Sequence, residues 1–164
     1  MRSKDPSTQC GACIMRDNRP LGWGYNGFVL GIEDSPEKWQ SEEKLKYVIH
    51  SERNAIANCV KAGVSSFEGS CMYIWTSSPH RVYLPCHDCA REIVTYGIPT
   101  IKIITTKENM FLGPTEDRRW NSGLSLEIFE KAGVDVLAFS AEEVNKMLFE
   151  TSDRKLSPRG LAND

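Results

Sequence analysis

Residues 51–76, SERNAIANCVKAGVSSFEGSCMYIWT, place a helical pattern directly before a strand pattern. Apolar side chains recur at helical spacing from Ala55 to Ala62, and Gly63 is typical of the residue that follows a helix. Residues 71–76 form an apolar run of strand length. Because α/β domains alternate helices with buried strands, this segment predicts an α/β fold.

The same alternation continues toward the C-terminus. Periodicity predicts further elements, which are the helices 85–96, 124–132 and 141–149 and the strands 101–105 and 134–139. Gly97 and Gly133 follow two of these helices, as expected of helix ends. We expect the strands to form one sheet that helices cover on both faces.

Two strand-like runs lie near the N-terminus, at residues 10–16 and 21–30. The turn-forming residues Asp17-Asn18-Arg19-Pro20 separate them, so the pattern predicts a hairpin. Residues 31–47 are polar and charged. We interpret them as an insertion or lid that contains a short helix through Trp39.

The length of 164 residues suits one domain, predicted over residues 1–150, with a polar tail at 151–164. No apolar run reaches the roughly 18 residues of a membrane helix, and no apolar segment follows Met1. We therefore expect a cytoplasmic protein without membrane contact. The 20 basic and 22 acidic residues give a net charge of −2, which argues against a partner of duplex nucleic acid.

Six cysteines are the unusual feature of this composition. A cytoplasmic chain keeps its thiols reduced, so metal binding or catalysis explains them better than three disulfides. We predict that Cys59 and Cys71 are core residues and that Cys10 and Cys13 pack within a strand. A redox dithiol or a second zinc site is the alternative for Cys10 and Cys13.

Two motifs stand at the predicted starts of helices, His50-Ser51-Glu52 and Pro85-Cys86-His87-Asp88-Cys89. One imidazole and two thiolates leave the fourth tetrahedral position of zinc open, which is the arrangement of a catalytic site. Helix N-termini also favour thiolates, because the helix dipole lowers the pKa of a cysteine.

These motifs predict a zinc site with three protein ligands, which are His50, Cys86 and Cys89. Glu52 is not a ligand in this assignment, but transfers protons beside the metal. His87 lies between the two cysteines, and on a helix it would point away from the face that they share.

Four blocks of the chain together resemble the deoxycytidylate (dCMP) deaminases of the cytidine deaminase superfamily. They are residues 2–9 with Gly11-Ala12, and residues 24–27, 50–56 and 85–89. The resemblance implies a three-layer α/β/α sandwich with a central five-stranded mixed sheet. It also implies zinc-dependent hydrolysis of dCMP to dUMP and ammonia by a homo-oligomer, often a hexamer, that dCTP and dTTP regulate.

The resemblance also implies roles for residues outside the zinc site. Asn26 would contact the sugar hydroxyl or an allosteric nucleotide, and Asn54 would shape one of those two sites. Groups for the substrate phosphate would come from the N-terminal residues Arg2, Ser3 and Lys4. A further group of residues near the end of the second strand-like run and in the insertion could bind an allosteric triphosphate, because aromatic rings stack on bases and carboxylates bind Mg²⁺. Packing at a contact between subunits explains the same residues equally well. The group consists of Gly27, Phe28, Glu33, Asp34 and Trp39.

The chain departs from the family pattern at three places. Ser51 stands where the family usually has Ala between His and Glu, and Met1 directly precedes a motif that usually follows an amphipathic helix. The loop at residues 77–83 is longer than expected before the second zinc motif. We expect the zinc chemistry to survive the first change and the pocket to be reshaped by the loop.

Two other functions use the same motifs. One is a deaminase of free cytidine or deoxycytidine, or of adenosine in tRNA, although the balanced charge weakens the tRNA alternative. The other is a non-catalytic nucleotide-binding module that zinc stabilises, with a further cysteine as the fourth ligand.

Overall fold

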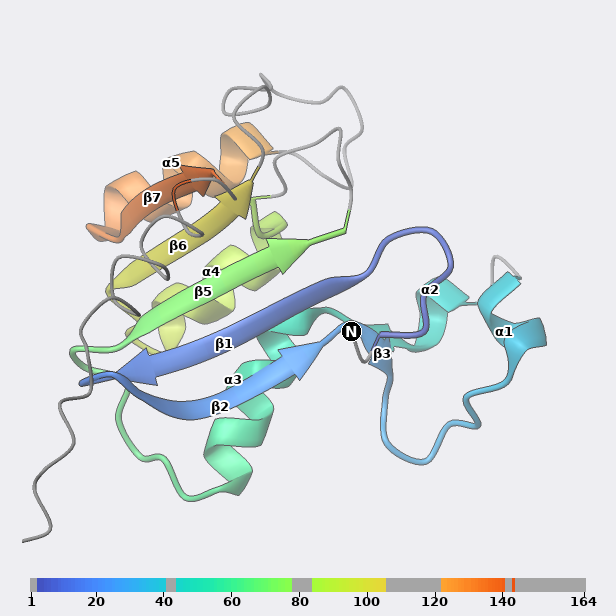
Figure 1. The fold of residues 1–164 in the computed structure, drawn as a ribbon. Helices are drawn as coiled ribbons and strands as arrows, with labels where there is room; N and C mark the ends of the chain where they lie inside the picture. Colours follow the sequence, from blue (N-terminus) through green and yellow to red (C-terminus); the bar gives the residue numbers. More distant parts are fainter. Residues whose placement is uncertain (1–2, 41–43, 78–83, 106–121, 141–142, 144–164) are drawn as a thin grey trace, which may run out of the picture.

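The computed structural model describes residues 3–40, 44–77, 84–105, 122–140 and 143. Five strands form one mixed sheet in the order β2-β1-β5-β6-β7 (Figure 1). Their bounds are β1 Cys10–Arg16, β2 Arg19–Tyr25, β5 Cys71–Thr76, β6 Thr100–Thr105 and β7 Asp135–Ser140. β1 runs antiparallel to β2 and β5, whereas β5, β6 and β7 are parallel. The predicted α/β class and five-stranded mixed sheet are confirmed.

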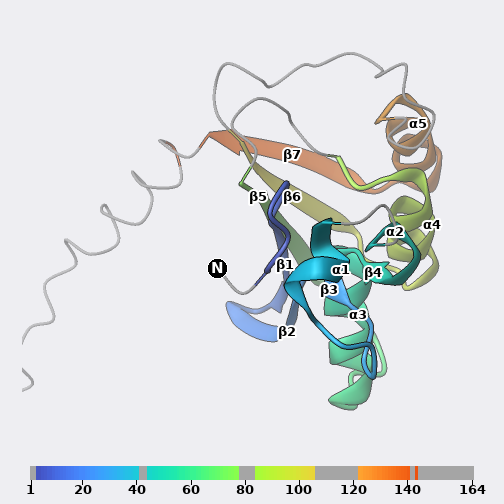
Figure 2. The same ribbon diagram turned by 90° about the vertical axis from the view of Figure 1, so that its right-hand side faces the viewer.

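Three longer helices lie on one face of this sheet, as Figure 2 shows. They are α3 Ser51–Lys61, α4 His87–Thr95 and α5 Ser122–Ala132. Alternate residues of the central strands are buried against this layer. The core cluster contains Ala12, Ile14, Met72, Ile74 and Ile101 from the strands and Ala55, Ile56, Ile93 and Phe129 from the helices. Two neighbouring parallel strands need a long connection, usually a helix, because the chain must cross back to the other end of the sheet before the second strand begins.

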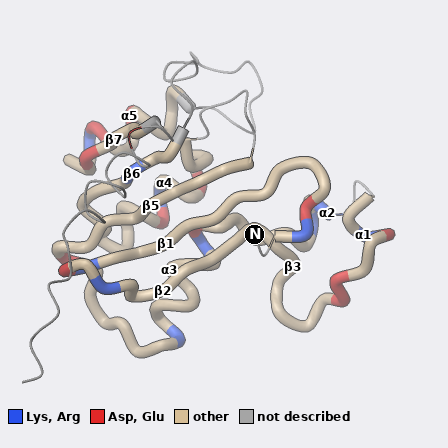
Figure 3. The backbone as a smooth tube through the Cα atoms, in the orientation of Figure 1, with Lys and Arg blue, Asp and Glu red and all other residues tan. Residues whose placement is uncertain are grey.

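The second helical layer stays a prediction. The helix expected at 141–149 and the tail at 151–164 lie outside the described residues, apart from position 143. None of the described helices is long and apolar enough to cross a membrane. Basic and acidic residues are dispersed over the described chain (Figure 3).

The predicted hairpin is formed by β1 and β2, but its turn is tighter than expected. Asp17 and Asn18 have φ angles of 51° and 60°, the left-handed values that a two-residue hairpin turn needs at both positions. Arg19 and Pro20 belong to β2, opposite Arg16 and Met15. Pro20 is tolerated because β2 is an edge strand of the sheet.

The second predicted strand, 21–30, is wrong beyond Tyr25. The chain leaves the main sheet at Asn26, and β3 Gly27–Phe28 pairs with β4 Val48–Ile49. The insertion between β3 and β4 holds α1 Pro36–Gln40, the short helix that was predicted, and α2 Lys44–Tyr47. β3 and β4 form a separate two-stranded sheet, whose pairing brings the two ends of the insertion together directly before His50.

Helix α3 packs on β2 at van der Waals distance from its backbone. A Cβ atom at Gly24 would collide with the backbone of Ser51 and Ala55. The Asn54 side chain donates to the Tyr25 carbonyl at 2.9 Å and ties the same helix to the strand. Glycine at position 24 therefore sets where the N-terminus of α3 lies.

Candidate metal centre

The N-termini of two helices meet beside the sheet and carry the predicted ligands. His50 is the N-cap of α3 and Cys86 is the N-cap of α4, both with extended backbone, and Cys89 follows in the first part of α4. An ion pair between Arg53 and Glu92, 2.5 Å long, joins α3 to α4. Helix α4 starts at His87, two residues later than predicted, because Cys86 has an extended conformation.

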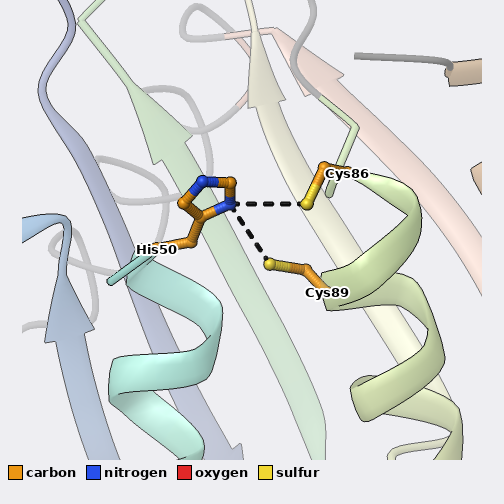
Figure 4. A group of neighbouring side chains, drawn as sticks. All are labelled: His50, Cys86 and Cys89. Atoms are coloured by element: carbon orange, nitrogen blue, oxygen red, sulfur yellow. Dashed lines mark hydrogen bonds between the residues drawn. The ribbon is translucent and has the colours of Figure 1, made fainter. Parts of the chain in front are cut away.

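The three predicted ligands form one cluster (Figure 4). His50 Nδ1 lies 3.4 Å from Cys86 Sγ and 3.4 Å from Cys89 Sγ, and all three ligand atoms lie within 4.8 Å of one another. Atoms bound to the same tetrahedral zinc lie roughly 3.5–4 Å apart, given the usual Zn–N and Zn–S distances. The spacing of the donor atoms therefore fits zinc.

The protonation of the cluster also fits a divalent cation. The hydrogen bond from the Cys89 thiol lowers the pKa of Cys86 to about 4, and that same bond, together with burial, raises the pKa of Cys89. The hydrogen bond with Cys86 raises the pKa of His50. The Cys86 thiol thus ionises more readily than the Cys89 thiol, whereas a bound cation would favour the thiolate form of both.

Glu52 lies beside the cluster in a cavity of about 240 Å³. The cavity wall includes His50, Ser51, Glu52 and Cys86. Glu52 is 7% exposed, and its Oε2 accepts a hydrogen bond of 2.8 Å from the hydroxyl of Ser51, which is fully buried. Glu52 is not part of the ligand cluster, and its role in proton transfer stays a prediction.

Asn26 also lines this cavity and is held by the N-terminal segment. Its Oδ1 accepts from the Cys10 amide at 2.8 Å, and its Nδ2 donates to the Thr8 carbonyl at 2.9 Å and to Asp5 Oδ2 at 3.3 Å. The side chain therefore fixes residues 5–10 against the end of β2. Its contact with a sugar stays a prediction.

Of the residues predicted for the phosphate, Ser3 and Lys4 do not meet at the cavity. Ser3 is buried and accepts from the Asp5 amide, whereas Lys4 is 64% exposed and pairs with Asp34 at 3.0 Å. Neither residue lines the cavity, and neither does Asn54. Arg2 lies outside the described residues.

The residues predicted for an allosteric nucleotide gather in the insertion. Phe28 and Trp39 stack on each other with ring centroids 4.3 Å apart, and Trp39 is 5% exposed. The Trp39 indole donates to Asp34, and Glu33 pairs with Lys38. Gly27 pairs with Ile49 in the two-stranded sheet. In the described structure Trp39 thus stacks on a neighbouring ring, and the triphosphate site stays a prediction.

Asp5 and Lys44 are cavity residues that were not predicted. The Asp5 carboxylate accepts from the Ser7 amide at 2.8 Å and pairs with Lys44 Nζ at 3.2 Å. The Asp5-Pro6-Ser7 sequence is typical of a turn in which the carboxylate caps a later amide, and this signal could have identified Asp5. Lys44 comes from the insertion, and no local pattern distinguishes it from the other lysines there.

The cysteines outside the cluster differ in their surroundings, and none forms a disulfide. Cys59 is a core residue as predicted, whereas Cys13 and Cys71 are half-buried. Cys10 starts β1, lines the cavity and donates to Thr76 Oγ1, and burial raises the pKa of its thiol to about 11. His87 lies outside the ligand cluster, as expected, with Nε2 3.7 Å from the Asp88 carboxylate.

Known proteins resemble this chain over the region that contains both motifs. Residues 1–105 match the family model described as the cytidine and deoxycytidylate deaminase zinc-binding region. The deoxycytidylate deaminase of Mus musculus is 39% identical over 113 residues, 65% of this chain and 58% of that protein. The "Uncharacterized deaminase in luxG 3'region" of Aliivibrio fischeri is 35% identical over 136 residues, 82% of this chain and 81% of that protein. The chain thus spans less than two thirds of the mouse relative.

A solved structure shares the fold. The crystal structure of dCMP deaminase from the cyanophage S-TIM5 in complex with dCMP and dUMP matches 79% of this chain and 80% of that chain. The TM-score is 0.54 at 19% sequence identity. The family match covers the whole ligand cluster and Glu52. The chain belongs to the cytidine and deoxycytidylate deaminase family.

Proposed function

We propose that this chain is a zinc-dependent dCMP deaminase, which hydrolyses dCMP to dUMP and ammonia. The observation that carries the proposal is the His50, Cys86 and Cys89 cluster at a cavity that also holds the buried carboxylate of Glu52. The name and 39% identity of the mouse relative support the choice of dCMP as substrate.

The three clustered side chains would hold the metal. Bound zinc supplies the Lewis acidity that makes water a nucleophile near neutral pH. Three protein ligands leave one of four positions for that chemistry, whereas a structural site would use four. Among the described residues, the cluster contains one histidine and two cysteines and no fourth ligand.

Glu52 would carry the protons of the reaction. Its carboxylate accepts a proton from the attacking water and delivers it to N3 of the cytosine base, while the water oxygen bonds to C4. The same carboxylate then takes the second proton from the new C4 hydroxyl and gives it to the departing amino group, so that the C4–N bond breaks, the C4 carbonyl forms and ammonia leaves. Burial of Glu52 in the cavity keeps bulk water from competing for these protons.

The test is a metal analysis combined with an ammonia-release assay on dCMP, CMP, deoxycytidine and dCTP. We expect about one zinc per chain, as the three-ligand cluster predicts, and ammonia release that is fastest with dCMP. Zinc without ammonia from any of the four compounds would contradict the proposal and favour a binding module. Release that is fastest with deoxycytidine would favour a nucleoside deaminase.

The proposal extends to regulation and assembly. A homo-oligomer that dCTP and dTTP regulate, with Mg²⁺ accompanying the triphosphate, follows from the family resemblance. The cytoplasm suits the site because it keeps both thiol ligands reduced. Sedimentation with and without dCTP, and dCMP turnover measured across dCTP concentrations, test these parts separately.

A further inference from the structure

Lys44 brings a positive charge to the cavity that contains Glu52. Helix α2 places this side chain in the cavity wall, where it is 20% exposed. Among the described residues that line the cavity, Lys44 is the one Lys or Arg. The lysine expected to serve an anion, Lys4, instead pairs with Asp34 and lies outside the cavity wall.

The ammonium group of Lys44 is held by three long contacts with Asp5 and Ser7. Lys44 Nζ lies 3.2 Å and 3.5 Å from the two carboxylate oxygens of Asp5, and 3.4 Å from Ser7 Oγ. All three contacts are longer than the roughly 2.7–2.9 Å of a strong charge-assisted hydrogen bond. A small rotation of the ammonium group can therefore exchange one of these contacts for a ligand in the cavity.

The Asp5 carboxylate is shared among several donors. Besides Lys44, it accepts from the amides of Ser7 and Thr8 and from Asn26 Nδ2. A carboxylate that serves four donors neutralises any one of them incompletely. Lys44 thus keeps positive potential on the side that faces the cavity, and Asp5 fixes where that charge lies.

We propose that Lys44 contacts the 5′-phosphate of the substrate and makes the cavity select a nucleoside monophosphate over the free nucleoside. This inference rests on the proposed function, because it takes the base to lie at Glu52 and the zinc ligands. A nucleotide in that orientation must direct its phosphate to another part of the same cavity wall. Lys44 is the described residue there whose charge suits a phosphate.

The test measures binding separately from turnover. Zinc-loaded wild-type protein and the Lys44→Gln variant are titrated with dUMP and with deoxyuridine, and kcat/KM is measured for dCMP. We expect K44Q to weaken dUMP binding about tenfold, the usual scale for a hydrogen bond to a charged group, and to change deoxyuridine binding less than about twofold. Lys131→Gln, which removes an exposed charge of α5, is the matched control and should change neither.

Two further variants separate phosphate binding from a structural ion pair. Asp5→Asn keeps an oxygen acceptor for the Ser7 and Thr8 amides and leaves Lys44 charged, so it should weaken dUMP binding less than K44Q does. Lys44→Arg keeps the positive charge and should retain the preference for dUMP over deoxyuridine. This variant still tests the proposal if K44Q fails to fold. If D5N and K44Q weaken dUMP and deoxyuridine equally, the role of Lys44 is overturned. Wild-type protein that releases no ammonia from dCMP overturns the proposed function itself.

Discussion

Glu52 illustrates how one residue separates binding of the metal from turnover. Glu52→Gln keeps the side-chain shape but removes the group that accepts and returns a proton. Because Glu52 lies outside the ligand cluster, we expect one zinc per chain in E52Q as in the wild type. We expect kcat to fall by about 10² to 10⁴, the range for general acid–base catalysis. Metal analysis and ammonia release measure the two quantities.

Glu130→Gln provides the control, since Glu130 is an exposed carboxylate of α5. Its turnover should match that of the wild type. If E52Q turned over dCMP as fast as the wild type, Glu52 would have no role in proton transfer. If E52Q lost its zinc, Glu52 would have to be counted among the metal ligands.

Ser51 distinguishes this chain from the usual family pattern and has a defined partner. Its buried hydroxyl donates to Glu52 Oε2, which leaves Oε1 as the second acceptor of the carboxylate. We expect Ser51→Ala to lower kcat about three- to tenfold with little change in KM, because one hydrogen bond that orients the carboxylate is lost. Steady-state kinetics on dCMP measure this, and an unchanged kcat would show that the hydroxyl only fills space.

The metal ligands could be predicted from the sequence, whereas the rest of the cavity could not. His50, Cys86 and Cys89 lie at helix starts, and the spacing within each motif fixes their direction locally. Lys44 lies at the cavity in an insertion whose two ends are held together by the pairing of β3 with β4. Such a contact depends on tertiary structure, so no local pattern contains it.

At the scale of elements, the position of α3 depends on the absence of a side chain on β2. Gly24→Ala would place a Cβ against the backbone of Ser51 and Ala55 and push the helix from the strand. We expect G24A to lower the free energy of unfolding by about 1–3 kcal/mol, the usual cost of overpacking. Because α3 carries His50, zinc affinity should fall as well. Urea denaturation and zinc titration measure these effects.

Gly11→Ala is the matched control for this prediction. Gly11 lies on the neighbouring strand β1, and a Cβ there would meet only the Gly24 carbonyl, at 4.0 Å. Its stability and zinc affinity should stay close to those of the wild type. Equal losses in both variants would contradict a specific role for the contact between Gly24 and α3.

The elements themselves were predicted where their pattern is local. Helix α3 and strand β5 have the expected bounds to within a residue, because apolar spacing alone identifies them. The strand expected at 21–30 breaks at Asn26, whose side chain binds the N-terminal segment instead of continuing the edge of the sheet. The hydrogen bonds of Asn26 join residues at least 16 positions apart in the sequence. The local spacing of apolar residues cannot predict such contacts.

At the scale of the whole molecule, the cluster joins two helices that are separated along the chain. His50 belongs to α3, and Cys86 and Cys89 belong to α4, so a metal held by all three would link the helical layer at the edge of the cavity. A bound cation would add metal–ligand bonds to the contacts of His50 Nδ1 with Cys86 Sγ and Cys89 Sγ. The folded state should therefore depend on the metal as well as on its core.

Removal of zinc under reducing conditions should lower the melting temperature. A ligand at about 100 times its Kd stabilises a fold by about 2.7 kcal/mol, which for a chain of this size corresponds to a shift of roughly 5–10 °C. Thermal melts before and after chelation measure the shift. Added Zn²⁺ should restore the melting temperature and Mg²⁺ should not, because thiolates prefer the softer ion.

Cys86→Ser should melt near the zinc-free value with or without zinc, whereas Cys71→Ser should keep the zinc response. An equal response in both variants would place the stabilising metal elsewhere.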